Sequence, residues 1–129
     1  MNAKELSHLI PLSDLSAQAL SQAAGLAREA VIEAGQMLFQ KGSRDAHSLY
    51  LLSGEVALDT EDGKPVRHVR AGSEAARHPL ARMKQRNCSC VTTCTSRLVL
   101  FSDDDLDHLV ARDQATAYEV TEFEGDDPQ

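Results

Sequence analysis

The sequence predicts a mainly β domain with flanking helices, built as a small antiparallel sandwich or barrel. Short runs rich in Val, Leu, Phe, Tyr and Thr alternate with single glycines between residues 30 and 102, as strands joined by tight turns do. No helix of crossover length separates these runs, which favours antiparallel over parallel pairing. At 129 residues the chain has room for one such core.

A short helix is predicted before the strands, over residues 17–24. Ser16 is the expected N-cap, because its hydroxyl can accept a hydrogen bond from an amide of the first turn. Leu20 and Ala24 would lie on its apolar side, and Gly25 is expected to end it. We interpret this element as a lid or packing helix for the β domain.

Three stretches carry the predicted strands, 30–43, 48–73 and 88–102. In the second stretch, Asp62 and Gly63 lie between two apolar runs and predict a hairpin, since its turn needs backbone angles that Gly and Asx residues tolerate. The regular spacing of the turn glycines further favours a sandwich or barrel.

A second helix is predicted after the last strand, from about residue 104 to residue 111. Ser102 or Asp103 can cap it, and the acids that follow suit the positive end of the helix dipole. Later the chain becomes acidic and contains Gly and Pro, a composition typical of linkers. We therefore divide the chain into a domain over 1–112 and an acidic C-terminal extension or linker over 113–129.

The net charge of −7 is unevenly distributed along the chain. Residues 64–86 are strongly cationic and contain Glu74 as their only acid, whereas residues 103–129 are acidic and contain Arg112 as their only Lys or Arg. A nucleic-acid partner is not expected, because binding to phosphate backbones needs a basic face. A small anionic ligand could be attracted to the first region.

Neither a membrane protein nor a disulfide-bonded one is predicted. No apolar run approaches the roughly 20 residues that span a bilayer, and the first residues lack a secretory signal, so we expect a cytoplasmic protein. Cys88, Cys90 and Cys94 would project from one side of an extended strand, but no C-x2-C pair is present to bind zinc. We interpret them as free cysteines. The sequence shows no nucleophile paired with a base, so we do not expect an enzyme.

The order of elements resembles the cyclic nucleotide-binding domain, the sensory module of catabolite-activator-type regulators, cyclic-nucleotide-dependent kinases and gated channels. The stretches "AGQMLFQKGSRDAHSLYLLSGEVAL" and "AGSEAARHPLARMKQRNCSCVTTCTSRLVLFSDDDLDHL" carry the resemblance. It implies a double-stranded β-helix, a jelly-roll-like β-roll. The positions that match turn glycines and core residues of the family are Gly35, Phe39, Gly42, Tyr50, Gly54, Val56 and Gly72.

The resemblance also implies a phosphate-binding cassette within residues 71–91. In the family, amides of a short helix and one arginine take the cyclic phosphate, and a glutamate takes the ribose 2′-hydroxyl. The arginine position falls on Arg86, followed by Asn87, while the glycine and glutamate positions fall on Ala76 and Arg77. Because a guanidinium cannot accept a hydrogen bond from the ribose, we expect weakened or absent cyclic AMP binding.

Two interpretations of this site remain open. In the first, the domain is a non-catalytic sensory or regulatory module whose ligand is a cyclic nucleotide or another phosphate compound. Its ligand-binding residues would be Arg86, Arg77, Ala76, Asn87 and His78. In the second, the site is without ligand, Arg77 pairs with Glu74, and the module docks on a neighbouring protein domain or forms a homodimer.

Overall fold

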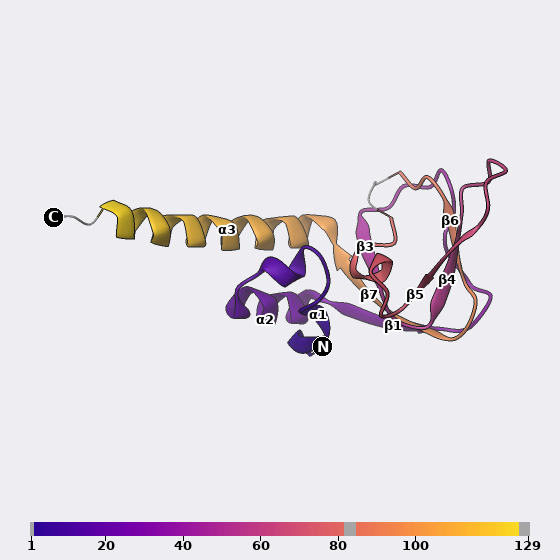
Figure 1. The fold of residues 1–129 in the computed structure, drawn as a ribbon, viewed down its shortest axis with the longest axis horizontal. Coiled ribbons are helices and arrows are strands. Elements are labelled where there is room, and N and C mark those ends of the chain that lie inside the picture. The colour runs from indigo at the N-terminus through magenta and orange to yellow at the C-terminus, as the bar shows by residue number, and fades with distance from the viewer. Residues whose placement is uncertain (1, 82–84, 127–129) are drawn as a thin grey trace.

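The chain forms a β-roll with helices packed at one end, and the last helix extends away from the roll (Figure 1). The computed structural model describes residues 2–81 and 85–126. In chain order the elements are α1 (Ala3–Leu6), the 3-10 helix η1 (Leu12–Asp14), α2 (Ala17–Leu26), β1 (Arg28–Ile32), β2 (Met37–Phe39), β3 (His47–Ser53), β4 (Glu55–Asp59), β5 (Arg67–Arg70), the 3-10 helix η2 (Ala75–Arg77), β6 (Ser89–Thr92), β7 (Ser96–Ser102) and α3 (Asp103–Asp126).

The described strands form two antiparallel sheets. One has the order β1-β7-β3 and the other the order β2-β6-β4-β5, so strands distant in sequence are neighbours in both. The predicted fold class, mainly β with flanking helices, is therefore confirmed. The hairpin predicted around Asp62 and Gly63 is also present: it joins β4 to β5 in an antiparallel pair, and Gly63 has a φ of 85°.

Two apolar cores hold the domain together. The first lies where the helices meet the three-stranded sheet, and there the rings of Tyr50 and Phe101 make an edge contact with centroids 6.1 Å apart. The second fills the roll between the sheets and includes Phe39, Val56 and Cys90. The core positions that the resemblance implied, Phe39, Tyr50 and Val56, are all buried.

Helix α2 begins as predicted. The Ser16 hydroxyl accepts a hydrogen bond from the Ala19 amide at 3.1 Å, and the helix continues one residue past Gly25 to Leu26. The carboxylate of Asp113 in α3 accepts two further hydrogen bonds, from the Ser16 amide at 2.9 Å and from the Ser16 hydroxyl at 2.7 Å. Two hydrogen bonds therefore connect the start of α2 to α3.

The prediction for the last helix was wrong in length. A helix over about 104–111 was expected, with linker after it, but α3 runs from Asp103 to Asp126. Acidic composition suggested a linker, yet the residues up to 124 include no Gly or Pro, and one Gly lowers helix stability by only about 1 kcal/mol. Residues 127–129 lie outside the described residues, and the division into 1–112 and 113–129 stays a prediction.

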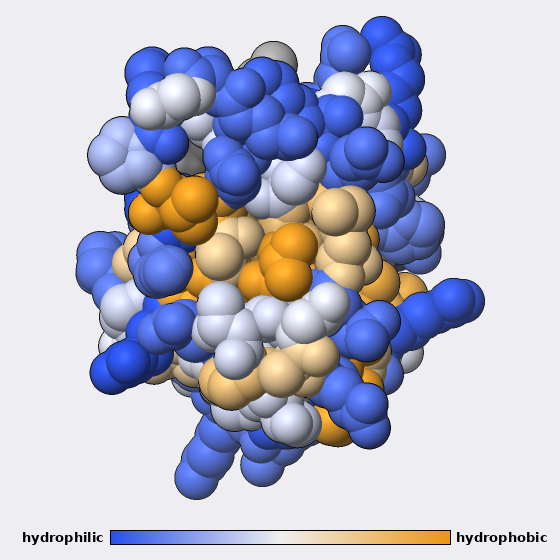
Figure 2. All heavy atoms as spheres, turned by 90° about the vertical axis from the view of Figure 1, so that its right-hand side faces the viewer, coloured by the Kyte–Doolittle hydropathy of each residue, from blue (hydrophilic) through white to orange (hydrophobic). Residues whose placement is uncertain are grey.

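The outer face of the four-stranded sheet carries a row of apolar side chains. The register places Met37 opposite Val91, and Val91 opposite Ala57, so the three lie side by side across β2, β6 and β4. Met37 is 57% exposed, and the other two are half-buried. Figure 2 views the molecule from the side of this sheet and shows apolar side chains in the middle of the face with polar ones around them. This apolar row is a surface feature, separate from the two cores.

The three cysteines do not share one strand, contrary to the sequence prediction. Cys88 precedes β6, Cys90 lies within it, and Cys94 is exposed after it. Burial raises the pKa of the Cys90 thiol to about 12, so it packs as a neutral apolar group. Among the described residues, no cluster of His, Cys, Asp and Glu is placed to bind a metal ion.

Within the same residues, no helix combines the length and the apolar character that crossing a bilayer requires.

Candidate ligand-binding site

The segment that follows β5 packs back against the roll through backbone hydrogen bonds. The Ala71 amide donates to the carbonyl of Gly54 at 3.0 Å, and the Leu80 amide donates to the carbonyl of Leu49 at 2.8 Å. Between them lies η2, a single short turn of 3-10 helix, and Ala76 within it is only 3% exposed. Ala76 is therefore a core residue in this structure.

Arg86 is buried, with 3% of its surface exposed, and its side chain contacts the loop between β2 and β3 and the first residue of β3. Its Nη2 donates to the carbonyl of His47 at 2.6 Å and lies 3.7 Å from the carboxylate of Asp45. The guanidinium also lies over the ring of Phe39, 5.0 Å from the centroid, an arrangement typical of cation–π contacts. The backbone of Arg86 pairs with the same loop, donating to Ser43 at 2.8 Å.

Asp45 is the charged partner of this arrangement. One of its oxygens lies 2.8 Å from Nδ1 of His47 and the other faces Arg86. Burial alone would raise the pKa of Asp45, but the hydrogen bond with His47 and the charges of His47 and Arg86 outweigh it and lower the pKa. The carboxylate is thus ionised near neutral pH and offsets the charge of the buried arginine.

Arg77 is engaged by the protein as well. Its Nη1 lies 3.1 Å from a carboxylate oxygen of Glu74, and its Nε donates to the carbonyl of His8 at 2.9 Å. The Arg77 carbonyl in turn accepts from the amide of Ile10 at 2.7 Å. Pairing with Glu74 is what the ligand-free interpretation predicts, and it ties this segment to the N-terminal residues.

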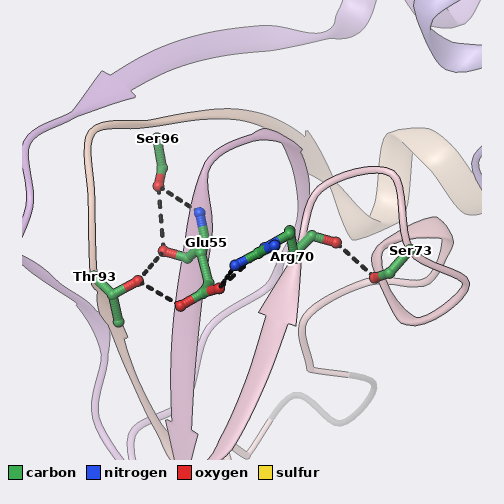
Figure 3. Close-up of polar contacts among 5 residues, drawn as sticks. All are labelled: Glu55, Arg70, Ser73, Thr93 and Ser96. Atoms are coloured by element: carbon green, nitrogen blue, oxygen red, sulfur yellow. Dashed lines mark hydrogen bonds and ion pairs between the residues drawn. The ribbon is translucent and has the colours of Figure 1, made fainter.

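Arg70 is held on the outer side of β5. Its Nε donates to a carboxylate oxygen of Glu55 at 3.3 Å, and the other oxygen accepts from the hydroxyl of Thr93 at 3.0 Å (Figure 3). The Thr93 hydrogen bond and the contact with Arg70 outweigh desolvation and lower the pKa of Glu55. The hydroxyl of Ser96 donates to the backbone carbonyl of Glu55, and the hydroxyl of Ser73 donates to that of Arg70.

The largest of the described cavities next to the cassette has a volume of about 820 Å³ and lies between the β4–β5 hairpin and the segment after β5. It is lined by Leu58, Thr60, Lys64, Pro65, Arg67, Ala75, His78, Pro79, Leu80, Ala81, Asn87 and Cys88. Two of these residues are cations, and no described lining residue is a carboxylate. Of the predicted ligand residues, His78 and Asn87 lie on this cavity, whereas Arg86, Arg77 and Ala76 do not.

A second cavity, of about 470 Å³, lies between the same segment and α3. Arg86, His47, Asp103 and Asp107 line it, and the hydroxyl of Ser48 donates to Asp103 at 2.5 Å. His78, Pro79 and Ala81 line both cavities, so this short stretch of chain forms a shared wall. The structure thus places Arg86 and Asn87, neighbours in sequence, on different cavities.

Lys64 and Arg67 were not among the predicted ligand residues. The sequence did show the signal that could have found them, because both belong to the cationic stretch 64–86. The resemblance directed attention to the cassette, which is the later part of that stretch. The pairing of β4 with β5 brings the earlier part to the opposite wall of the same cavity.

Comparisons with known proteins agree on the fold. A family model described as cyclic nucleotide-binding domain matches residues 29–113. Among curated proteins, no sequence matches this chain significantly.

Solved structures with the same fold are similar over most of this chain. Cyclic AMP-bound PfPKA-R matches with a TM-score of 0.72 and 15% identity, over 95% of this chain and 43% of the other. A structure described as a putative cyclic nucleotide-binding protein from Geobacter metallireducens GS-15 matches with a TM-score of 0.68 and 19% identity, over 92% of this chain and 88% of the other. The sensor domain of the transcriptional regulator DNR from Pseudomonas aeruginosa matches with a TM-score of 0.67 and 18% identity, over 89% and 81%.

At these identities the solved structures establish the fold, and this chain spans less than half the length of PfPKA-R. The architecture is a β-roll with the cassette segment after β5 and a helix after β7. Since the family model also covers well over half of the sequence, the chain belongs to the cyclic nucleotide-binding domain family.

Proposed function

We propose that this domain is a non-catalytic sensory or regulatory module that binds a small anionic, nucleotide-like ligand. The observation that carries the proposal is the cavity of about 820 Å³, within the size range of small-molecule sites. Its described lining holds Lys64 and Arg67 and no carboxylate. A concave site lined by charge of one sign concentrates ligands of the opposite sign.

Ordinary cyclic AMP is expected to bind weakly to this cavity. The described lining offers no carboxylate to accept a hydrogen bond from the ribose 2′-hydroxyl. Residues 82–84 lie outside the described residues, and in sequence they are Arg, Met and Lys. The loss of one hydrogen bond to a charged group lowers affinity on the order of tenfold.

Arg86 and Arg77 remain proposed ligand residues, together with Ala76, Asn87 and His78. Each of the two arginines would have to leave a protein carboxylate to reach an anion in this cavity. Such an exchange would loosen the loop around Asp45 and give the ligand two states of the domain to select between. The second cavity, bordered by α3, lies next to this change, so α3 is the proposed output element.

The partner that receives the signal is proposed to be a neighbouring protein domain or a second copy of the chain. Nucleic acid is not a proposed partner, because the chain carries a net charge of −7. The three cysteines are free, which is typical of proteins in reducing compartments, and the proposed location is the cytoplasm.

Titration calorimetry with cyclic AMP, cyclic GMP and a cyclic dinucleotide tests the proposal. At least one of these probes is expected to bind and to raise the melting temperature, since ligand binding to the folded state stabilises it. Cyclic AMP is expected to bind in the micromolar range or weaker. Folded protein that shows neither heat nor a shift in melting temperature with any probe would contradict the proposed function.

A second candidate function is a ligand-free docking or dimerisation unit. Two observations favour it: Arg86 and Arg77 are already paired with carboxylates, and α3 continues well beyond α2 (Figure 1). Light scattering across a range of protein concentrations separates the two candidates. A stable dimer combined with no ligand heat supports the docking unit, whereas a monomer that binds a probe supports the sensory module.

A further inference from the structure

The cations of the 820 Å³ cavity lie on the wall opposite the cassette. We infer that Arg67, supported by Lys64, is the main group that holds the anion of the ligand. This inference rests on the proposed function and assigns an orientation to its ligand. The anionic group would face the β4–β5 hairpin, and the rest of the ligand would lie toward the segment after β5.

The described arginines between residues 67 and 86 differ in what they already contact. Arg70, Arg77 and Arg86 each form an ion pair with a carboxylate of the chain, at 3.3, 3.1 and 3.7 Å. Within residues 2–81 and 85–126, the guanidinium of Arg67 makes neither a hydrogen bond nor an ion pair. Its donors are therefore available to a ligand without the loss of a protein contact.

The strand register explains why Arg67 lies on the cavity. Arg67 is paired with Leu58 across β4 and β5, and directly opposed residues project from the same face of a sheet. Leu58 is 5% exposed and belongs to the core inside the roll, so this face is the inner one. His68, the next residue, is paired with Ala57 and projects from the outer face instead.

The charge of Arg67 reaches the opposite wall of the cavity. Burial raises the pKa of the Cys88 thiol, and the positive charges of Arg67 and Arg86 oppose that rise. Cys88 lies beside Asn87 on the cassette wall, so a group bound between the walls would be within the field of Arg67. Lys64, in the hairpin, adds a second cation, and its ammonium is 3.8 Å from Asp62 in an exposed pair.

The remaining lining defines the chemical class of the ligand. Most of it is apolar, with Leu58, Pro65, Pro79 and Leu80 as the larger side chains, and Thr60 and Asn87 add neutral polar groups. We therefore assign a ligand with one phosphate or carboxylate group on a compact, largely apolar ring system. Since the described lining holds no carboxylate to accept a hydrogen bond from a sugar hydroxyl, ribose and deoxyribose forms of a nucleotide should bind about equally well.

The test is calorimetry on the full chain with cyclic AMP, 2′-deoxy cyclic AMP and inorganic phosphate as probes. The variants are Arg67→Gln and, as a matched control, Arg70→Gln, which removes the same charge from the outer side of the same strand. Arg67→Gln is expected to weaken each probe that binds by about tenfold or more, because a charged hydrogen bond is lost. Arg70→Gln and the 2′-deoxy probe should each stay within about twofold of the wild-type value for cyclic AMP.

The outcomes separate this inference from the proposed function. If a probe binds the wild type and Arg67→Gln binds it equally well, the inference fails while the proposed function stands. Equal losses in Arg67→Gln and Arg70→Gln, or a tenfold preference for ribose, would also overturn it. If none of these probes binds the wild type, the inference fails, and the proposed function fails with it only when cyclic GMP and the cyclic dinucleotide also give no heat. Tighter binding of the nucleotides than of inorganic phosphate supports the assigned ligand class, and equal binding would contradict it.

Discussion

At the scale of single residues, Gly54 is the described glycine with the least space for a side chain. It joins β3 to β4 with a φ of 94°, and a Cβ added there would lie 2.8 Å from the Cα of Ser96. We expect Gly54→Ala to destabilise the fold by about 2–3 kcal/mol, from left-handed strain and from displacement of the β7 backbone. Urea denaturation measures the change.

Gly63 provides the control for this prediction. It has a similar φ of 85°, but a Cβ there would meet no atom within 4 Å. Gly63→Ala should therefore cost only the backbone strain, about 1–2 kcal/mol. Equal destabilisation by the two substitutions would show that the contact with Ser96 does not matter.

Asp45 is the residue through which pH should act on the cassette. Its pKa in the folded chain lies below the ordinary value of 3.8, so its contribution to stability is present above that value and is lost as the pH falls through the folded pKa. Asp45→Asn should lower the melting temperature at pH 7 and reduce its decrease between pH 5 and about pH 3. Asp14→Asn, an exposed carboxylate in η1, serves as the control and should change neither. An unchanged acid profile in Asp45→Asn would contradict the role of the pair with Arg86.

Sequence reasoning at this scale succeeded for side chains whose place follows from local pattern. Ser16 as a cap and Gly63 as a turn residue both follow from residue type and local pattern. The orientation of Arg86 could not be predicted, because its partners Asp45 and His47 come from a loop about 40 residues earlier and meet it only when the roll closes. A motif position therefore gave the residue but not what it contacts.

At the scale of elements, the contact between Asp113 and Ser16 couples α3 to the start of α2. Asp113→Ala removes the acceptor of two hydrogen bonds, and we expect it to destabilise the fold by about 1 kcal/mol. Combining it with Ser16→Ala should give less than the sum of the two single effects, because both remove the hydrogen bond between the Ser16 hydroxyl and the Asp113 carboxylate. Chemical denaturation of the single and double variants measures the coupling, and strict additivity would contradict it.

The strands were predictable as elements because apolar alternation and turn glycines are local signals. The pairing of β2 with β6, and of β1 with β7, depends on closure of the roll and was accessible only through the resemblance. The length of α3 was missed because a charged helix has no apolar period to reveal it. The same limit applied to Lys64 and Arg67, since a cationic hairpin reads as a solvated turn until the opposite wall is known.

At the scale of the whole molecule, the two cores should suffice for folding without the far part of α3. The last members of the described cores are Leu109 and, partly buried beside them, Val110. We expect a chain that ends after Ala115 to keep the far-ultraviolet circular dichroism signal of the β-roll. Its melting temperature should lie within a few degrees of that of the full chain. Loss of cooperative melting would instead show that residues after 115 belong to the folding unit, against the predicted boundary near 112.

The wall that His78, Pro79 and Ala81 contribute to both cavities is one chain thick. We therefore expect a shift of this wall to change the shape of both cavities at once. A guest molecule beside β5 would act on α3 by its bulk, without any bond to the helix. Chemically unrelated guests of equal size would produce the same response at Asp107, and a smaller guest of higher affinity would produce less.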